Sequence, residues 1–135
     1  MESLGKPKAP SERFPKSMRL HSRLDFNELF DRGAVAVEKS VVVHARRAQQ
    51  PGRLGISVSK RVGSAPVRNR WKRLIRESYR RLVGRSPAVR QIDLVVRPRR
   101  GAQADFQAIQ RSLENAVRRL LSQVLGPTPP TRRGP

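Results

Sequence analysis

Nine cations fall in one short stretch of the chain, from Lys60 to Arg81, together with a single acid, Glu77. Nine positive charges and one negative charge give this stretch a local charge of +8. On a helix of 3.6 residues per turn, five of the cations lie within an arc of roughly 140° at about 100° per residue. They are Arg68, Lys72, Arg73, Arg76 and Arg80. With Glu77 as the only acid, we predict that these five lack intrahelical partners and that this helix face binds an anion.

The opposite face of the same predicted helix is apolar. Its residues are Val67, Trp71, Leu74, Ile75 and Leu82. We expect Trp71 to pack against a sheet rather than to stack on a base, and we leave Tyr79, near the boundary between the faces, unassigned. A solvated cationic face is the alternative, but such faces usually alternate with Glu for i,i+4 pairing. A helix buried on one side and cationic on the other therefore favours contact with a nucleic acid.

The residues that carry catalysis in other proteins are scattered here. His21 and His44 have no acid at helical spacing, which disfavours a metal site. Ser57 and Ser59 alternate with apolar residues and fit strand positions better than nucleophiles. The sequence has no GxxxxGK[ST] phosphate loop, and its ten acids are dispersed. We therefore predict no catalytic residue and no metal site in the polypeptide.

The composition of the chain indicates which class of partner it binds. The chain has 135 residues, enough for one domain with a modest core, and it carries a net charge of +20 with a pI of about 12.0. Such a charge favours nucleic acid first and an acidic membrane surface second. No apolar run is long enough for a membrane span or a signal peptide, and there is no cysteine. We predict a cytoplasmic protein with no membrane partner.

Both helices and strands are predicted around the basic helix, and they must hold it in place. A Ser22–Asp25 capping box opens the first helix, Gly33 ends it, and Ser64 is the predicted N-cap of the basic helix. Three helices are predicted, within 22–33, 64–84 and 105–126. Four strands are predicted, at 35–37, 41–45, 54–59 and 92–97. The order α-β-β-β-α-β-α predicts an α+β fold with a small four-stranded mixed, mainly antiparallel sheet packed with three helices. Residues 1–18 and 126–135 are predicted to be disordered basic tails around a folded RNA-binding domain of residues 19–125.

The block LGISVSKRVGSAPVRNRWKRLIRE, residues 54–77, resembles the signature of the protein component of bacterial ribonuclease P. That family has a strand ending in S-K-K/R, a Val/Ile-Gly-x-Ala turn and then an R-N-R-x-K-R helix. Here these parts are residues 59–61, 62–65 and 68–73. The first helix, from Asp25-Phe26 to Arg32-Gly33, also resembles the family's. The likeness covers roughly Arg19 to Leu125.

The resemblance implies a ribonucleoprotein endonuclease that removes the 5′ leader from precursor tRNA. One protein would bind one catalytic RNA and the leader, and would lower the Mg²⁺ requirement. The RNA would do the chemistry with Mg²⁺ that it mainly binds itself, so the polypeptide alone is not expected to be catalytic. The family also implies a left-handed crossover around the basic helix, against the strong right-handed rule.

The resemblance also implies roles for individual residues. Contact with the catalytic RNA is expected from Arg68, Asn69, Arg70, Lys72, Arg73 and Arg76. The leader cleft or its mouth is expected to be lined by Phe26, Phe30, His44, Ser57, Lys60 and Arg61.

The central strand departs from the family pattern. Relatives often carry aromatic residues where this chain has Val41 and His44. Base stacking contributes about 1–3 kcal/mol per base, so we expect the leader to depend more on Phe26, Phe30 and electrostatics. Either Phe can equally be a core residue, and the expectation fails if both are buried beneath neighbouring side chains.

Two other functions fit the charge. A structural module that holds ribosomal RNA would share the basic helix and tails, but it predicts no substrate cleft and no discrimination between precursor and mature tRNA. A DNA-binding helix in a major groove fits less well, because the helix buries one face in its own domain and no dimerisation element is evident.

Overall fold

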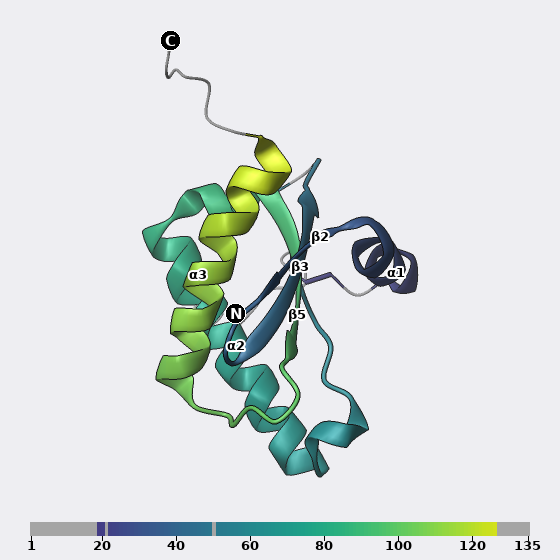
Figure 1. The fold of residues 1–135 in the computed structure, drawn as a ribbon, viewed down its shortest axis with the longest axis vertical. Coiled ribbons are helices and arrows are strands. Elements are labelled where there is room, and N and C mark those ends of the chain that lie inside the picture. The colour runs from purple at the N-terminus through teal and green to yellow at the C-terminus, as the bar shows by residue number, and fades with distance from the viewer. Residues whose placement is uncertain (1–18, 21, 50, 127–135) are drawn as a thin grey trace, which may run out of the picture.

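In the part of the chain that the computed structural model describes, three α-helices pack around one four-stranded sheet (Figure 1). That part is residues 19–126 except 21 and 50, so the predicted arm (1–18) and residues 127–135 of the predicted tail lie outside the described residues. The helices are α1 (Arg23–Arg32), α2 (Ala65–Arg85) and α3 (Phe106–Leu125). The strands are β2 (Ala34–Val37), β3 (Val41–Arg47), β4 (Leu54–Ile56) and β5 (Ile92–Pro98), and two 3₁₀ turns are η3 (Lys60–Val62) and η4 (Pro87–Gln91). The α+β class and the order of helices and strands confirm the prediction.

The sheet has the strand order β2-β3-β5-β4. Strand β3 pairs antiparallel with β2 and with β5, whereas β4 runs parallel to β5. This is the predicted mixed, mainly antiparallel sheet. Helix α2 connects the adjacent parallel strands β4 and β5, which is the crossover that the family resemblance implies. The left hand of that crossover stays a prediction.

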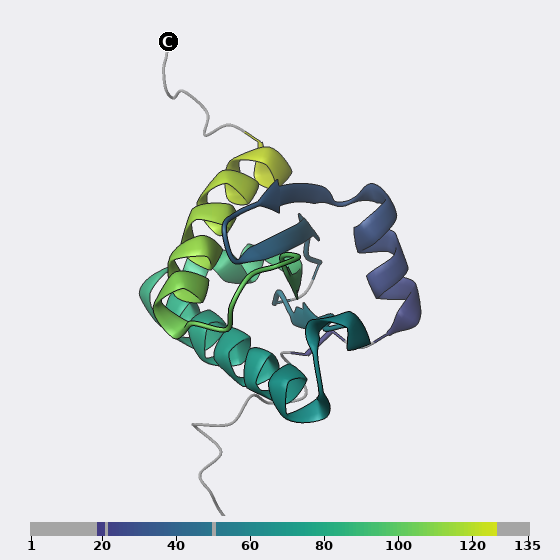
Figure 2. The same cartoon turned by 60° about the horizontal axis from the view of Figure 1, so that its bottom comes forward.

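Helices cover the two faces of the sheet unequally. Helices α2 and α3 lie on one face, and α1 alone lies on the other (Figures 1 and 2). The main core lies beneath α2 and α3 and includes alternate residues of the central strands, such as Val43 and Leu94. Trp71 is 2% exposed within this core, which confirms that it packs against the sheet. Tyr79 is fully buried there, and this burial is the main reason that the pKa of its hydroxyl is raised to about 12.

Several predicted boundaries differ from the structure. Strand β3 continues two residues beyond the prediction, to Arg47, and β2 and β5 are each one residue longer. Strand β4 ends at Ile56, because the chain turns after Ser57 into η3 to reach the start of α2; the Ser57 N–H still donates to the Val96 carbonyl at 3.0 Å. Helix α2 passes through Gly84 to Arg85, since Gly84 is exposed, with open space where a Cβ would project.

The turn from α1 into β2 needs a glycine. A Cβ on Gly33 would lie 2.5 Å from the Leu29 carbonyl oxygen and 2.9 Å from that of Ala45. At the other end of α1, the Ser22 side chain accepts from the Asp25 N–H at 3.4 Å, as the capping box predicted. The N-terminus of α1 is therefore specified locally, whereas its C-terminus also depends on the close approach of β3.

Candidate nucleic-acid interface

The N-terminal half of α2 presents cations without acidic partners. Within the described part of the chain, no carboxylate forms an ion pair with the five cations of this half, which are Arg68, Arg70, Lys72, Arg73 and Arg76. Two of them instead donate to carbonyl oxygens, Arg68 to Gly63 at 3.2 Å and Arg70 to Ala104 at 3.2 Å. The pKa of Arg76 is lowered, first by burial and then by the like charge of Arg19. Converging cations of this kind favour a bound anion.

The C-terminal half of α2 is different, because its arginines have acidic partners. Glu77 accepts from Arg80 at 2.6 Å and from Arg81 at 3.0 Å, and Glu114 of α3 pairs with Arg85. Hydrogen bonds from Arg80 and then Arg81 lower the pKa of Glu77. The prediction that Arg80 lacks an intrahelical partner is therefore wrong, since one carboxylate serves two guanidinium groups at i+3 and i+4. The unpaired cationic surface ends about halfway along the helix.

The sheet face beneath α1 is arranged in three rows across the strands. The register places Arg46 opposite Asp93, His44 opposite Val95, and Val42 opposite Arg97. The first row is ionic: Arg46 pairs with Asp93 across the strands and also with two acids of α1. The middle row lies under the α1 aromatic rings. The third row is open, and Arg97 there is exposed. The face is thus closed at one end and open at the other.

Two aromatic rings of α1 stand over the middle row. The Phe26 and Phe30 centroids are 6.2 Å apart, and Phe30 meets the His44 ring edge to face at 4.8 Å. Phe30 is 37% exposed, so the two rings are not both buried beneath neighbouring side chains. Phe26 is half-buried against the small cluster of Leu20, Leu29 and Val95. Of the two predicted rings, Phe30 is the one that a ligand can reach.

His44 lies on the floor of this face rather than on its surface. It is 5% exposed, and its Nε2 accepts from Arg97 Nε at 3.3 Å. Burial, and then the charge of Arg97, lowers its pKa, so the imidazole is neutral at pH 7. With Nε2 accepting, the proton is on Nδ1, which has no hydrogen-bond partner among the described residues. His44 therefore holds Arg97 and supports Phe30.

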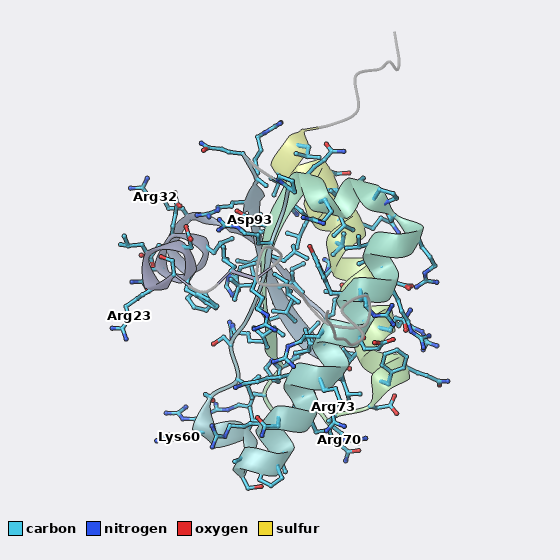
Figure 3. All side chains as sticks on the ribbon, turned by 180° about the vertical axis from the view of Figure 1, so that it is seen from behind. Arg23, Arg32, Lys60, Arg70, Arg73 and Asp93 are labelled. Atoms are coloured by element: carbon cyan, nitrogen blue, oxygen red, sulfur yellow. The ribbon has the colours of Figure 1, made fainter. Side chains whose placement is uncertain are left out.

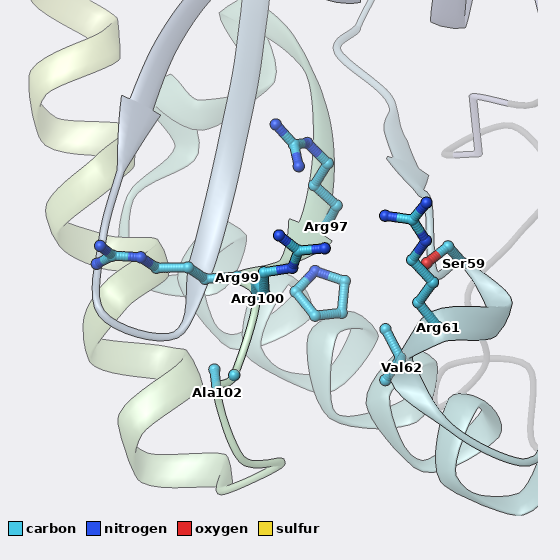
Figure 4. Close-up of a pocket in the computed structure, with 9 residues that line it drawn as sticks. Ser59, Arg61, Val62, Arg97, Arg99, Arg100 and Ala102 are labelled. Atoms are coloured by element: carbon cyan, nitrogen blue, oxygen red, sulfur yellow. The ribbon is translucent and has the colours of Figure 1, made fainter.

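At the open end, a cavity of about 690 Å³ is lined by arginines from two distant segments. Arg61 comes from η3, and Arg97 and Arg100 come from the end of β5 and the loop after it (Figure 4). Arg99 also contributes to the lining, but its guanidinium points away, toward the Glu38 carbonyl at 3.1 Å. No acid is among the lining residues. The cavity suits the phosphate groups of a polyanion.

The structure brings part of the predicted leader group to the same end of the molecule as the cations of α2, whereas Phe26, Phe30 and His44 lie on or beneath α1. Lys60 and Arg61 are exposed in η3, which leads directly into the basic half of α2, and Figure 3 shows Lys60 at the same end as Arg70 and Arg73. Ser57 is half-buried at the end of β4. The prediction did not include the arginines at the end of β5 and in the loop after it, although the sequence R-P-R-R at 97–100 indicates a second cluster of cations.

The arrangement offers anion binding and aromatic stacking. Guanidinium groups can pair with phosphate oxygens while an exposed ring such as Phe30 stacks on an unpaired base. Among the residues that the structure describes, no group of three or more His, Cys, Asp or Glu side chains could hold a metal ion. The described helices also include none that is long and apolar enough to cross a membrane.

Comparisons with known proteins identify the family of this chain. A family model described as Ribonuclease P matches residues 14–121. The ribonuclease P protein component of Brevibacillus brevis is 40% identical over 107 residues, which span 77% of this chain and 83% of that protein. The RNase P protein of Staphylococcus aureus is similar in structure, with a TM-score of 0.66 and 33% identity over 76% of this chain and 94% of its own. That of Thermotoga maritima has a TM-score of 0.61 and 32% identity over 75% and 96%. The chain therefore belongs to the ribonuclease P protein family, as residues 54–77 predicted.

Proposed function

We propose that this chain is the RNA-binding subunit of a ribonuclease P that removes the 5′ leader from precursor tRNA. In this proposal the N-terminal half of α2 binds the catalytic RNA, and the face beneath α1 binds the leader. One observation carries the proposal: among the described residues, cations without acidic partners run from α2 through η3 to the arginine-lined cavity, and Arg97 of that cavity donates to His44, on which the exposed ring of Phe30 packs. One continuous surface thus offers phosphate contacts and base stacking together.

The catalytic RNA is the partner assigned to α2. The exposed side of the helix carries Asn69, Arg70 and Arg73, and the half-buried Lys72 lies beside Asn69. Guanidinium groups suit bidentate contact with phosphates, and α2 is held rigidly because Trp71 and its neighbours are buried in the core. A fixed row of cations binds a folded RNA backbone without first being ordered, which keeps the entropic cost of association low.

The leader is the partner assigned to the cleft, because the site suits a single strand. Bases in a duplex are stacked on one another, whereas an unpaired base is free to stack on Phe30. From this ring the strand would pass over the open row of the sheet, near Arg97, and reach the cavity lined by Arg61 and Arg100. Mature tRNA has no leader, so this contact would favour the precursor over the product.

Mg²⁺ is assigned to the RNA in this proposal. The carboxylates of Asp25 and Asp93, between α1 and the sheet, already pair with Arg46 and Arg53 in the described structure. The residues present therefore fit a protein that supplies cations rather than metal ligands. Its cations would reduce the repulsion between RNA phosphates, so fewer Mg²⁺ ions would be needed for the same assembly. We place this assembly in the cytoplasm, with one protein per RNA.

The test is cleavage of precursor tRNA by a bacterial ribonuclease P RNA at low millimolar Mg²⁺, with and without the protein. Stimulation is expected from the unaltered protein, and Arg68→Ala combined with Arg73→Ala should abolish most of it. Arg80→Ala combined with Arg81→Ala is the matched control, because it also removes two charges and both are already paired with Glu77. No stimulation, or equal losses in all variants, would contradict the proposal and favour a passive module that binds ribosomal RNA.

A further inference from the structure

We propose that an ion-pair cluster centred on Arg46 positions α1 over the sheet and thereby sets the geometry of the leader cleft. Arg46 is then a positioning residue, which acts on the leader through the placement of Phe30 and not through contact with RNA. This inference rests on the proposed function, because it concerns the same cleft.

Arg46 joins α1 to the sheet through three carboxylates. Its Nη2 lies 2.9 Å from Asp25 Oδ1, and its Nε lies 3.0 Å from Asp93 Oδ2. Its Nη1 also donates to Glu28. Asp25 and Glu28 belong to α1, whereas Asp93 belongs to β5, so one guanidinium connects α1 with two strands of the sheet. The fork geometry of Arg fixes the direction of each contact.

Asp93 is anchored more firmly than the other two acids. It is 3% exposed, and its Oδ1 accepts from the Arg53 N–H at 2.9 Å. The Arg53 side chain also approaches Asp25 Oδ2, at 3.8 Å. The cluster therefore has a buried, fixed side on the sheet and an adjustable side on α1. Figure 3 shows Asp93 between the sheet and α1, far from Lys60 at the open end.

Apolar contacts alone give α1 little to hold it in one place. Leu29 is its only buried residue, and it packs with Leu20 and Val95. By contrast, α2 buries five residues and α3 buries six. The ring of Phe26 lies directly on Gly55, where a Cβ would come within 2.7 Å of its Cζ atom. This contact is made by the edge of one ring, and α1 buries only Leu29. The directional contacts of Arg46 therefore do most to fix the position of α1.

Stability alone does not account for such a cluster. Removing charged groups from water costs free energy that their attraction only partly offsets, and apolar replacements of similar volume are often as stable. The clearest benefit of a partly buried ion cluster is a unique arrangement of the elements it joins. Here that arrangement places Phe30 over His44 with part of the ring exposed.

The neighbouring residue on β3 provides a matched control. Arg47 points to the opposite face of the strand and donates to the Leu125 carbonyl at 3.5 Å. Arg46→Met and Arg47→Met therefore remove the same charge from adjacent positions. We expect Arg46→Met to weaken the holoenzyme's affinity for precursor tRNA by about fivefold or more, since misplacing Phe30 forfeits much of one base-stacking contact. Affinities for mature tRNA and for the catalytic RNA should not change, and Arg47→Met should leave all three nearly unaltered.

A distance measurement gives a readout independent of activity. The chain has no cysteine, so spin labels can be placed at Asn27→Cys on the exposed side of α1 and Ser122→Cys on α3. The free protein and the Arg47→Met variant should give one narrow distance distribution, and Arg46→Met should broaden or shift it. Asp25→Asn should also broaden the distribution, and it keeps the ion pair of Arg46 with Asp93. This second variant tests the inference even if Arg46→Met fails to fold.

Several outcomes would overturn the inference. Equal losses in Arg46→Met and Arg47→Met would reduce the effect to net charge. An unaltered distance distribution in both Arg46→Met and Asp25→Asn would show that α1 is positioned without the cluster. If Phe30→Ala weakens precursor binding but Arg46→Met does not, the positioning role fails while the leader cleft stands. If neither has an effect, the proposed leader cleft fails as well.

Discussion

The division of α2 into an unpaired and a paired half predicts unequal effects for two arginines on the same helix. Arg73 has no acidic partner among the described residues, whereas Arg81 lies 3.0 Å from Glu77. Replacing Arg73 by Ala should remove one phosphate contact, and replacing Arg81 by Ala should remove none. Both substitutions lower the net charge equally, so long-range attraction alone predicts equal effects.

The magnitude follows from counterion release. Each phosphate contact contributes about 0.7–0.9 to the slope of log K against log salt, so five unpaired cations contribute roughly 3.5–4.5. Arg73→Ala should therefore reduce the slope by about 0.7–0.9 and weaken binding by about 1–2 kcal/mol, a factor of roughly 5–30. Arg81→Ala should change the slope by much less, because Glu77 already neutralises much of its charge.

The assay is the equilibrium affinity for the catalytic RNA over a series of salt concentrations. Thermal unfolding of each variant provides the control for folding. A similar reduction in slope for both variants would refute the reasoning, because the whole helix would then bind as a diffuse charge. No reduction for Arg73→Ala would exclude a phosphate contact at that residue.

Three further predictions concern the face beneath α1. Phe30→Ala should raise the KM for precursor tRNA, with loss of about 1–3 kcal/mol from one stacked base, and should leave the affinity for the catalytic RNA unchanged in a binding assay. Gly55→Ala should destabilise the fold by about 1–3 kcal/mol in urea titrations, because its Cβ would lie 2.7 Å from the Phe26 ring; an unchanged midpoint would contradict that packing. His44 has a pKa lowered by burial and then by Arg97. As the pH falls, His44 is protonated in the unfolded protein before it is protonated in the folded protein, so the free energy of unfolding should fall below about pH 6.5. His44→Phe should remove this part of the loss.

Local sequence patterns predicted most elements of the fold. The capping box at Ser22, the alternation from Leu54 and the 3.6-residue period of the basic helix each act within one segment, so one segment is enough to see them. The end of β4 was predicted too late, because apolar and polar residues alternate as far as Ser59 although the strand ends at Ile56 and the chain turns toward η3. Periodicity describes side chains and does not show where a connection must turn.

From the residues alone, the candidate site was predicted only where it is local, and the cleft that joins Phe30 to His44 was expected only from the family resemblance. The cations of α2 share one helix face and were visible, but the double pairing of Glu77 was missed, since a count of acids ignores that one carboxylate accepts from two arginines. The cavity joins Arg61 to Arg100, and the Arg46 cluster joins three separate elements. Contacts of this kind depend on the order of strands in the sheet, which no single segment encodes.

The most direct test of the leader cleft is photocrosslinking from the position of Phe30. Phe30 would be replaced by a benzophenone amino acid, which keeps an aromatic ring at the exposed edge of the cleft. In the holoenzyme with precursor tRNA, the cleft predicts crosslinks to leader nucleotides that disappear when mature tRNA is used. Crosslinks to the catalytic RNA alone, or equal yields with precursor and mature tRNA, would contradict it.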